Sequence, residues 1–195
     1  ESPASTPLAG ADADFVEHVA QILAGEARRV EAKSRLQYAA SHDQLTGLAN
    51  RAVFEQALAS HPGPVALLLV DLDAFKDIND TWGHAAGDQL LRVVAARLRR
   101  AVRPDDTVAR LGGDEFAVIA AADTQAVGTL LGRRLVASLS APAALDGRTV
   151  QVGASVGVAW TPGPVANGDR LLADADLALY AAKTGGRGQV QLYHE

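Results

Sequence analysis

Two acidic residues follow the most hydrophobic stretch of the chain. Residues 64–70 are all apolar, Asp71 comes directly after them, and Asp73 comes two residues later. A carboxylate at the end of a buried strand is costly unless it accepts hydrogen bonds or binds a cation. Asp73 stands where the N-cap of a following helix is expected, and capping alone explains that residue. Capping explains Asp71 less well, because the apolar run draws it toward the core, so Asp71 is a candidate cation ligand.

A second acidic pair, Asp114 and Glu115, follows Gly112 and Gly113. Glycine adopts positive φ without steric cost and lets the backbone approach a ligand closely. Gly-Asp is also common in ordinary turns, so this pair alone indicates little. If it meets Asp71 at neighbouring strand ends, the carboxylates form a cation site. Mg²⁺ takes one or two carboxylates together with substrate phosphates, and two such ions serve phosphoryl transfer.

Two basic residues, Lys183 and Arg187, flank the pair Gly185 and Gly186. Basic side chains suit a helix C-terminus for electrostatic reasons alone, and that explanation is sufficient when they are taken by themselves. Beside a carboxylate cluster that binds phosphates through a cation, the same two residues become candidate phosphate ligands.

A mixed α/β scaffold is predicted to position these residues. The apolar periodicity predicts helices over residues 51–60, 74–80, 84–102, 124–140 and 169–184, the last capped by Asp169. Strands are predicted over residues 64–72, 107–111, 115–121, 148–161 and 189–194. The two runs around Gly112 and Gly113 indicate a β-hairpin. The fold class is therefore α+β, with a central, mostly antiparallel sheet surrounded by helices.

The N-terminal part differs in composition from the rest. Residues 1–11 are rich in Pro, Ser and Ala and are predicted to be disordered, and residues 12–40 form one long helix. A narrow apolar stripe runs along it: Val16, Val19, Leu23, Ala27 and Val30. The other faces are charged, which suits a coiled-coil stalk; a helix lying on its own domain is an equal alternative. Residues 41–195 form the globular domain.

The composition excludes several functions. The 195 residues include no cysteine, so disulfides, thiolate zinc sites and thiol nucleophiles are absent. A net charge of −5 argues against a nucleic-acid-binding surface, which requires a broad basic footprint. No apolar run reaches the roughly 20 residues of a membrane span, and no signal peptide is recognisable, so a cytoplasmic location is expected.

Four segments together resemble a known family. Residues 110–116 read Arg-Leu-Gly-Gly-Asp-Glu-Phe, which contains the signature of GGDEF domains. Residues 43–51, residues 71–88 and residues 180–187 resemble three further motifs of that family, in its order and at its spacing. The resemblance covers residues 41–195 and identifies the chain as similar to diguanylate cyclases.

The resemblance implies a fold related to nucleotidyl cyclases and polymerase palm domains, and two Mg²⁺ ions per active site, with Mn²⁺ as an alternative. Asp71 is expected to bind both ions and Asp114 to bridge them, with the Leu72 carbonyl completing one site. Glu115 is expected to assist, either at the metal or by taking the proton of the attacking hydroxyl, and these two roles remain open.

The resemblance also implies a GTP site. Four residues are expected to hold the triphosphate: Phe75 and Lys76 through the backbone, and Lys183 and Arg187. Asn79 and Asp88 are expected to bind the guanine edge. A carboxylate at Asp88 accepts from guanine N1–H and the N2 amine, donors that adenine does not offer as a pair; a helix N-terminal acid is the simpler alternative for this position.

The implied reaction joins two GTP molecules into cyclic di-GMP and releases two pyrophosphates. Each domain holds one GTP, so the enzyme is expected to work as a homodimer with two-fold symmetry. The helix of residues 12–40 is then interpreted as pairing with its copy and transmitting a signal from an upstream sensor absent from this chain. Residues 15–36 look similar to the last helix of a GAF sensor.

A product-inhibition site is also expected. Residues 103–106, Arg-Pro-Asp-Asp, match the family's RxxD motif through Arg103 and Asp106, and Arg134 stands where a second inhibitory arginine often occurs. Arginine can bind guanine O6 and N7 in a bidentate manner. The simpler alternative is a solvated loop after a basic helix end.

Three other functions share part of this sequence pattern. A degenerate cyclic di-GMP receptor usually has a damaged signature, and this signature is intact. A catalytically silent GTP-binding module, as found before a phosphodiesterase, is the second. A polymerase-like palm acting on nucleic acid is the third, and the acidic charge argues against it.

Overall fold

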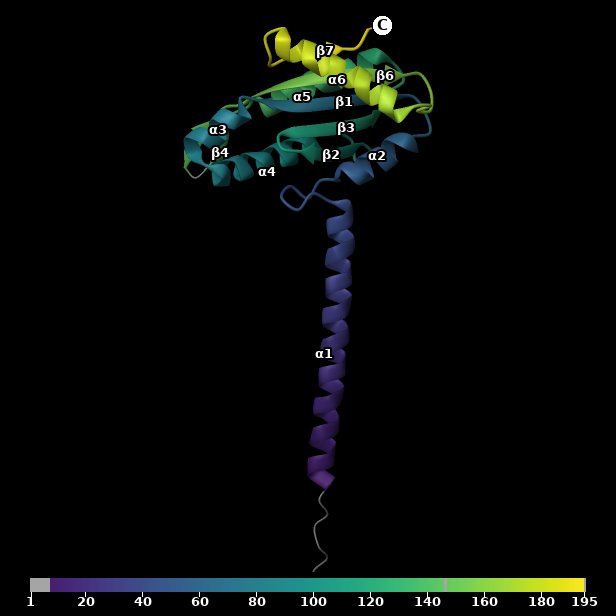
Figure 1. Ribbon diagram of the computed structural model, residues 1–195, viewed down its shortest axis with the longest axis vertical. Helices are drawn as coiled ribbons and strands as arrows, with labels where there is room; N and C mark the ends of the chain where they lie inside the picture. Colours follow the sequence, from purple (N-terminus) through teal and green to yellow (C-terminus); the bar gives the residue numbers. More distant parts are fainter. Residues whose placement is uncertain (1–7, 146, 195) are drawn as a thin grey trace, which may run out of the picture. The chain divides into compact units, whose positions relative to one another are not determined.

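The computed structural model describes residues 8–145 and 147–194 (Figure 1). Within the N-terminal helix, the side chains of residues 8–14, 16, 19, 22, 32 and 34–37 also lie outside the description. The helices are α1 (Leu8–Ser41), α2 (Arg51–Ala59), α3 (Phe75–Trp82), α4 (His84–Ala101), α5 (Gln125–Leu139) and α6 (Gly168–Thr184). The strands are β1 (Val65–Asp73), β2 (Thr107–Gly112), β3 (Glu115–Ala121), β4 (Ala143–Leu145), β5 (Arg148–Val150), β6 (Gly153–Thr161) and β7 (Val190–Leu192).

The chain divides into two compact units, residues 1–40 and residues 41–195. The first contains α1, which begins at Leu8, four residues before the predicted start, in an alanine-rich segment of high helix propensity. The predicted disordered tail therefore overlaps the helix at residues 8–11, and residues 1–7 lie outside the described part. Along α1 the side chains of Leu23 and Val30 are each 64% exposed. The described part of the predicted stripe is thus unpartnered in the single chain.

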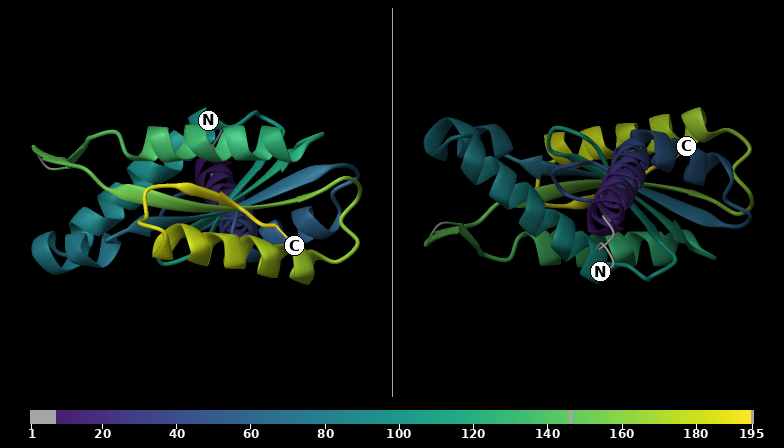
Figure 2. Two further views of the ribbon diagram at one scale, coloured as in Figure 1. Left: turned by 90° about the horizontal axis from the view of Figure 1, so that it is seen from above. Right: turned by 90° about the horizontal axis from the view of Figure 1, so that it is seen from below.

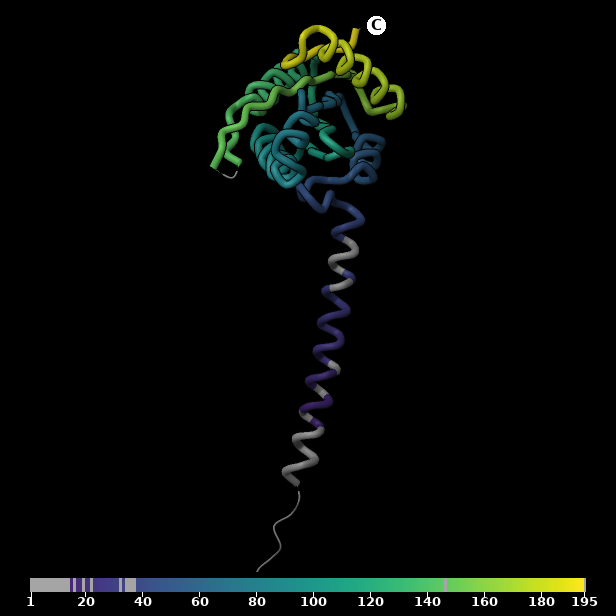
Figure 3. The backbone as a smooth tube through the Cα atoms, turned by 60° about the vertical axis from the view of Figure 1, so that its left-hand side comes forward, coloured from purple at the N-terminus to yellow at the C-terminus, as the bar shows by residue number. Residues whose placement is uncertain are grey.

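The second unit, called here the catalytic unit, is built on a five-stranded sheet in the order β2-β3-β1-β6-β7. All neighbours are antiparallel except β6 and β7, which run parallel and lie side by side in Figure 3. The predicted α+β class and the mostly antiparallel sheet are confirmed. In the centre, β1 is buried along its length up to Asp73, because helices cover both of its faces.

Two hydrophobic cores lie on opposite faces of the sheet. Residues alternate along β1, so that Leu68 and Val70 face α4 and α5, while Leu67 and Leu69 face α2 and α6. Figure 2 shows the sheet between α5 and α6 in both views. Asp71 continues the alternation of Leu67 and Leu69, and its side chain therefore lies on the α2–α6 face.

Several local predictions were wrong in detail. The strand predicted over residues 148–161 is interrupted into β5 and β6, and β5 pairs with β4, which periodicity did not indicate, in a separate two-stranded sheet. Helix α6 is capped by Asn167, whose side chain accepts a hydrogen bond from the Arg170 amide, and not by Asp169. Among the described residues no helix combines the length and apolar character that a bilayer span requires.

Candidate active site

Asp71 is a nearly buried carboxylate at the end of β1. The residue is 8% exposed, and its Oδ2 lies 2.7 Å from Nζ of Lys183 in α6. Burial raises the pKa of Asp71, and the negative charges of Asp114 and Glu115 raise it further. The hydrogen bond and positive charge of Lys183 lower this pKa, but the net shift is upward. Three carboxylates thus lie within electrostatic reach of one another. Lys183, which was expected on a phosphate, is the counter-ion of Asp71 in this structure.

The hairpin between β2 and β3 brings the other two acids to this point. Glu115 is the register partner of Asp71 across the antiparallel pair, so the two side chains share a face. Asp114 occupies the turn, where Gly112 and Gly113 both have positive φ, at 150° and 51°. No Cβ added at either glycine would meet another atom, so the backbone conformation, and not lack of space, favours glycine there.

Asp73 does not cap α3, contrary to the simpler explanation given for it. Its Oδ1 accepts a hydrogen bond of 2.7 Å from Ser155, and its Oδ2 accepts one of 3.0 Å from the Gly188 amide. The N-cap position belongs to Ala74, in a left-handed conformation with no side-chain cap. Asp73 therefore fastens the loop after α6 to the sheet, beside the Lys183–Asp71 pair.

One ion pair, which sequence reasoning did not identify, holds the hairpin. Arg110 Nη1 lies 3.1 Å from each carboxylate oxygen of Asp43, and its Nε and Nη2 donate to the Gly113 carbonyl. Burial raises the pKa of Asp43, but hydrogen bonds from Thr46 and Arg110 outweigh this and lower it overall. Both residues lie inside motifs that resemble the family, and that position was the only signal available.

The two expected guanine ligands come from adjacent helices. Asn79 lies in α3, and its amide packs on Gly87 of α4 so closely that a Cβ at Gly87 would stand 2.0 Å from Oδ1. Asp88, the next residue, is half-buried. Glycine at position 87 is therefore required for Asn79 to reach this place, and the structure brings the two expected ligands to one junction.

The expected phosphate ligands other than Lys183 come from two separate segments of the chain. Phe75 and Lys76 begin α3, directly after β1, and Lys76 is exposed. Arg187 is exposed in the loop that Asp73 holds through Gly188, and it has a positive φ of 60°. These three residues come from segments that meet at the same end of β1 as Asp71.

The donor set fits a divalent cation that substrate helps to hold. In the described part of the chain no three His, Asp or Glu side chains form a group arranged to hold a metal ion. Asp71 is nevertheless destabilised by burial and by two neighbouring carboxylates, which a divalent cation relieves. Mg²⁺ is suited to such a site, because it needs only one or two carboxylates when substrate phosphates supply further oxygens.

A second predicted site lies elsewhere. Arg103, Asp106 and Arg134, the three expected inhibitory residues, line one cavity of about 460 Å³ together with Arg133, which sequence reasoning missed. The cavity lies between the segment before β2 and helix α5. The Asp106 carboxylate accepts a hydrogen bond of 2.8 Å from the Arg103 amide, which fixes the loop.

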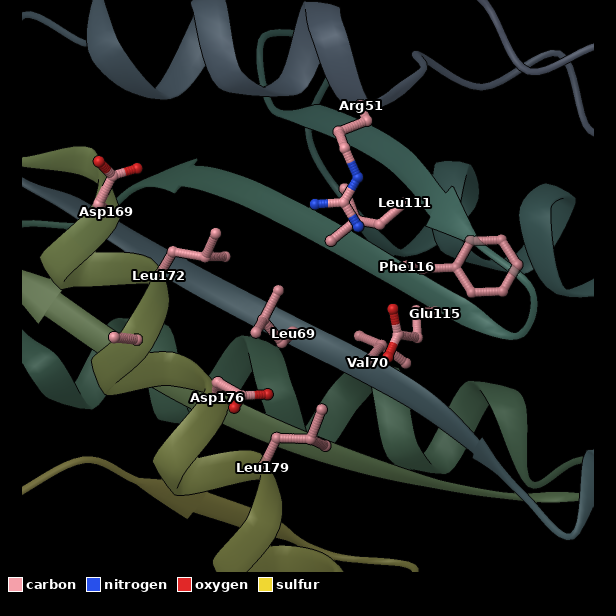
Figure 4. Close-up of a pocket in the computed structure, with 11 residues that line it drawn as sticks. Arg51, Leu69, Val70, Leu111, Glu115, Phe116, Asp169, Leu172, Asp176 and Leu179 are labelled. Carbon is pink, nitrogen blue, oxygen red and sulfur yellow. The ribbon is translucent and has the colours of Figure 1, made fainter.

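A further cavity of about 330 Å³, the α2–α6 trough, adjoins the carboxylates (Figure 4). Its floor is apolar and includes Leu69 and Leu111, and charged side chains stand along its walls: Arg51, Glu115, Asp169 and Asp176. Glu115 is shared with the Asp71 cluster through the β1–β3 register. No sequence motif indicated this trough, because its walls come from helices distant in the chain.

Comparisons with known proteins agree with this geometry. The family model for the diguanylate cyclase GGDEF domain matches residues 40–189 of this chain. Diguanylate cyclase TpbB of Pseudomonas aeruginosa is 40% identical over 188 residues, covering 92% of this chain and 43% of TpbB. Cyclic di-GMP phosphodiesterase NbdA of the same organism is 40% identical over 169 residues, covering 83% of this chain and 22% of NbdA.

A solved structure is similar over most of its length. The coiled coil and GGDEF domain of DgcB from Caulobacter crescentus, in complex with c-di-GMP, aligns with a TM-score of 0.77 and 31% identity, over 91% of this chain and 98% of that one. The chain spans less than half the length of the two curated relatives named above. With its signature on the hairpin and its carboxylates at the end of β1, the chain belongs to the diguanylate cyclase GGDEF domain family.

Proposed function

We propose that this chain condenses two GTP molecules into cyclic di-GMP and two pyrophosphates. The observation that carries the proposal is the meeting of Asp71, Asp114 and Glu115 beside Lys183 at the open end of β1. TpbB is named a diguanylate cyclase, and the DgcB structure contains c-di-GMP. The intact signature and the similarity to these proteins support the same chemistry here.

Asp71, Asp114 and Glu115, with the Leu72 carbonyl, are the residues that would hold Mg²⁺ or Mn²⁺. When bound, the ions supply neutralisation of phosphate charge as it develops in the transition state. Lys183 lies beside Asp71, and Arg187, Phe75 and Lys76 are at the same end of β1, so these four residues would contact the phosphates. Burial of Asp71 strengthens its electrostatic attraction to such a cation.

Asn79 and Asp88 orient the guanine at the α3–α4 junction. Asp88 accepts from N1–H and the N2 amine of guanine, and its half-burial increases the cost of leaving its carboxylate unpaired. An adenine base would offer no such pair of donors, so we infer preference for GTP over ATP.

In the proposed reaction the 3′-hydroxyl oxygen of one GTP forms a bond to the α-phosphorus of the other. The bond from that phosphorus to the bridging oxygen breaks, and pyrophosphate leaves. In this proposal the hydroxyl proton passes to Glu115, which shares a face with Asp71, or to solvent when Glu115 serves as a metal ligand. The same step in the opposite sense closes the ring, so two chains must face each other.

Two regulatory features accompany the proposal. The exposed Leu23 and Val30 of α1 suit pairing with the same helix of a second chain, which would hold two catalytic units together. The cavity lined by Arg103, Asp106 and Arg134 suits the guanine of cyclic di-GMP, because two arginines and a carboxylate face one space. An upstream sensor and a cytoplasmic location are part of the same proposal.

A second candidate is a catalytically silent module that binds GTP or cyclic di-GMP and regulates another domain. The similarity to NbdA, which is named a phosphodiesterase and of which this chain covers 22%, favours it. The complete carboxylate set favours the cyclase.

Incubation of the chain with GTP and Mg²⁺, followed by chromatography, tests the proposal. We expect cyclic di-GMP and pyrophosphate from the native chain, a loss of roughly 100-fold or more for Asp114→Asn, and native activity for Asp123→Asn, an exposed acid outside the cluster. Binding of GTP without any cyclic product would support the silent module and contradict the cyclase.

A further inference from the structure

The two walls of the α2–α6 trough carry opposite charges that are not paired. Arg51 begins α2 on one wall, and Asp176 stands on the α6 wall, both directed into the space in Figure 4. Both residues are exposed, and neither side chain makes a hydrogen bond or ion pair among the described residues. Unpaired opposite charges that face one space in a single chain are the arrangement expected when a second molecule completes the pairing.

The α6 wall continues toward the carboxylate cluster. Asp169, Asp176 and Lys183 recur at helical spacing on this flank, and Lys183 contacts Asp71. Tyr180, beside the same flank, is 67% exposed although it is aromatic. The α6 residues of this flank therefore connect the charged trough with the Asp71 cluster, where the second nucleotide must arrive.

Two-fold symmetry makes this surface self-complementary. A two-fold axis can lie between two facing copies and run along the trough. Rotation about this axis places each wall of one copy's trough opposite the other wall of the second copy's trough. Arg51 of one copy then faces Asp176 of the other, and the reverse pair forms at the same time, which is an isologous contact. A surface with only one sign of charge could not do this.

We propose that the α2–α6 trough is the docking face for a second copy of this chain, with Arg51 of each copy paired to Asp176 of the other. This proposal rests on the proposed function, which requires two facing chains, and names the residues that align them. Arg51 and Asp176 are positioning residues: they bring the two bound nucleotides into line and do not touch the reacting atoms.

A charge exchange distinguishes pairing between chains from pairing within one. Arg51→Glu and Asp176→Arg each place two like-charged contacts in a homodimer, so we expect cyclisation to fall about tenfold or more. In a mixed dimer of these two variants, purified with two different tags, both contacts between the chains are attractive. The same is true of a homodimer of the double variant. The mixed dimer and the double variant should each return to within about threefold of native activity. Recovery in the double variant but not in the mixed dimer would show pairing inside one chain and overturn the proposal, as would native activity in the single variants.

A second measurement does not depend on activity. Because the chain contains no cysteine, Arg51→Cys in one tagged chain and Asp176→Cys in the other introduce the only thiols. With 3′-deoxy-GTP and Mg²⁺ present, a short bis-maleimide should link the two chains, while Arg51→Cys with Asp123→Cys should not link. Absence of the first product refutes the docking face. Its presence in a chain that makes no cyclic di-GMP would retain the docking face and refute only the proposed function.

Discussion

The Arg110–Asp43 pair should stabilise the catalytic unit and the conformation of its signature hairpin. The pair joins residues 67 positions apart, and its side chains are 13% and 23% exposed. Exposed ion pairs contribute about 0–1 kcal/mol, and breaking a buried pair costs about 3–5 kcal/mol. For this intermediate burial we expect a coupling free energy of about 2 kcal/mol. Arg110→Met also removes both hydrogen bonds to the Gly113 carbonyl, so its total cost is about 3–4 kcal/mol.

A double-mutant cycle isolates the pair. Asp43→Asn keeps an oxygen acceptor for Thr46 and removes the charge that Arg110 faces. Urea unfolding of the four proteins, followed by tryptophan fluorescence, gives the coupling free energy. Both tryptophans, Trp82 and Trp160, lie in the catalytic unit, so the signal reports on that unit. A coupling below about 0.5 kcal/mol at pH 7 would refute the reasoning.

The same cycle predicts a pH dependence. The pKa of Asp43 lies below its ordinary value of 3.8 in the folded chain. Its stabilising contribution is therefore full above the unfolded pKa and is lost as the pH falls through the lower folded pKa. The coupling free energy should stay constant from about pH 7 to pH 5 and should decrease below about pH 4. A coupling that increases on acidification would contradict the assigned cause.

Three further outcomes are expected. Gly157→Ala should destabilise the catalytic unit by about 1–3 kcal/mol in urea unfolding, because its Cβ would stand 2.2 Å from the Ala175 carbonyl oxygen, whereas Gly163→Ala, with open space, should change little. Arg103→Ala should weaken cyclic di-GMP binding about tenfold or more in calorimetry without affecting GTP binding, and equal affinity would remove the inhibitory role. Deletion of residues 1–40 should lower cyclisation most at dilute protein; unchanged activity together with monomers of both lengths in sedimentation would contradict a pairing helix.

The sequence by itself determined most of the elements and the family. The apolar run before Asp71 predicts a central strand, and the paired glycines before Asp114 predict a hairpin, because burial on both faces and positive φ impose local residue choices. Four motifs at the family's spacing indicated the family, which the comparisons confirm. These signals are local in the chain, so periodicity and turn chemistry are enough to read them.

Only the tertiary structure decided the partners of those residues. The register of β1 with β3 places Glu115 opposite Asp71, and the packing of α6 brings Lys183 to the same carboxylate. Asp73 has the sequence context of a helix cap, yet it binds Ser155, 82 positions away in the chain. Such contacts depend on strand register and helix packing over long sequence separations, which local patterns do not encode.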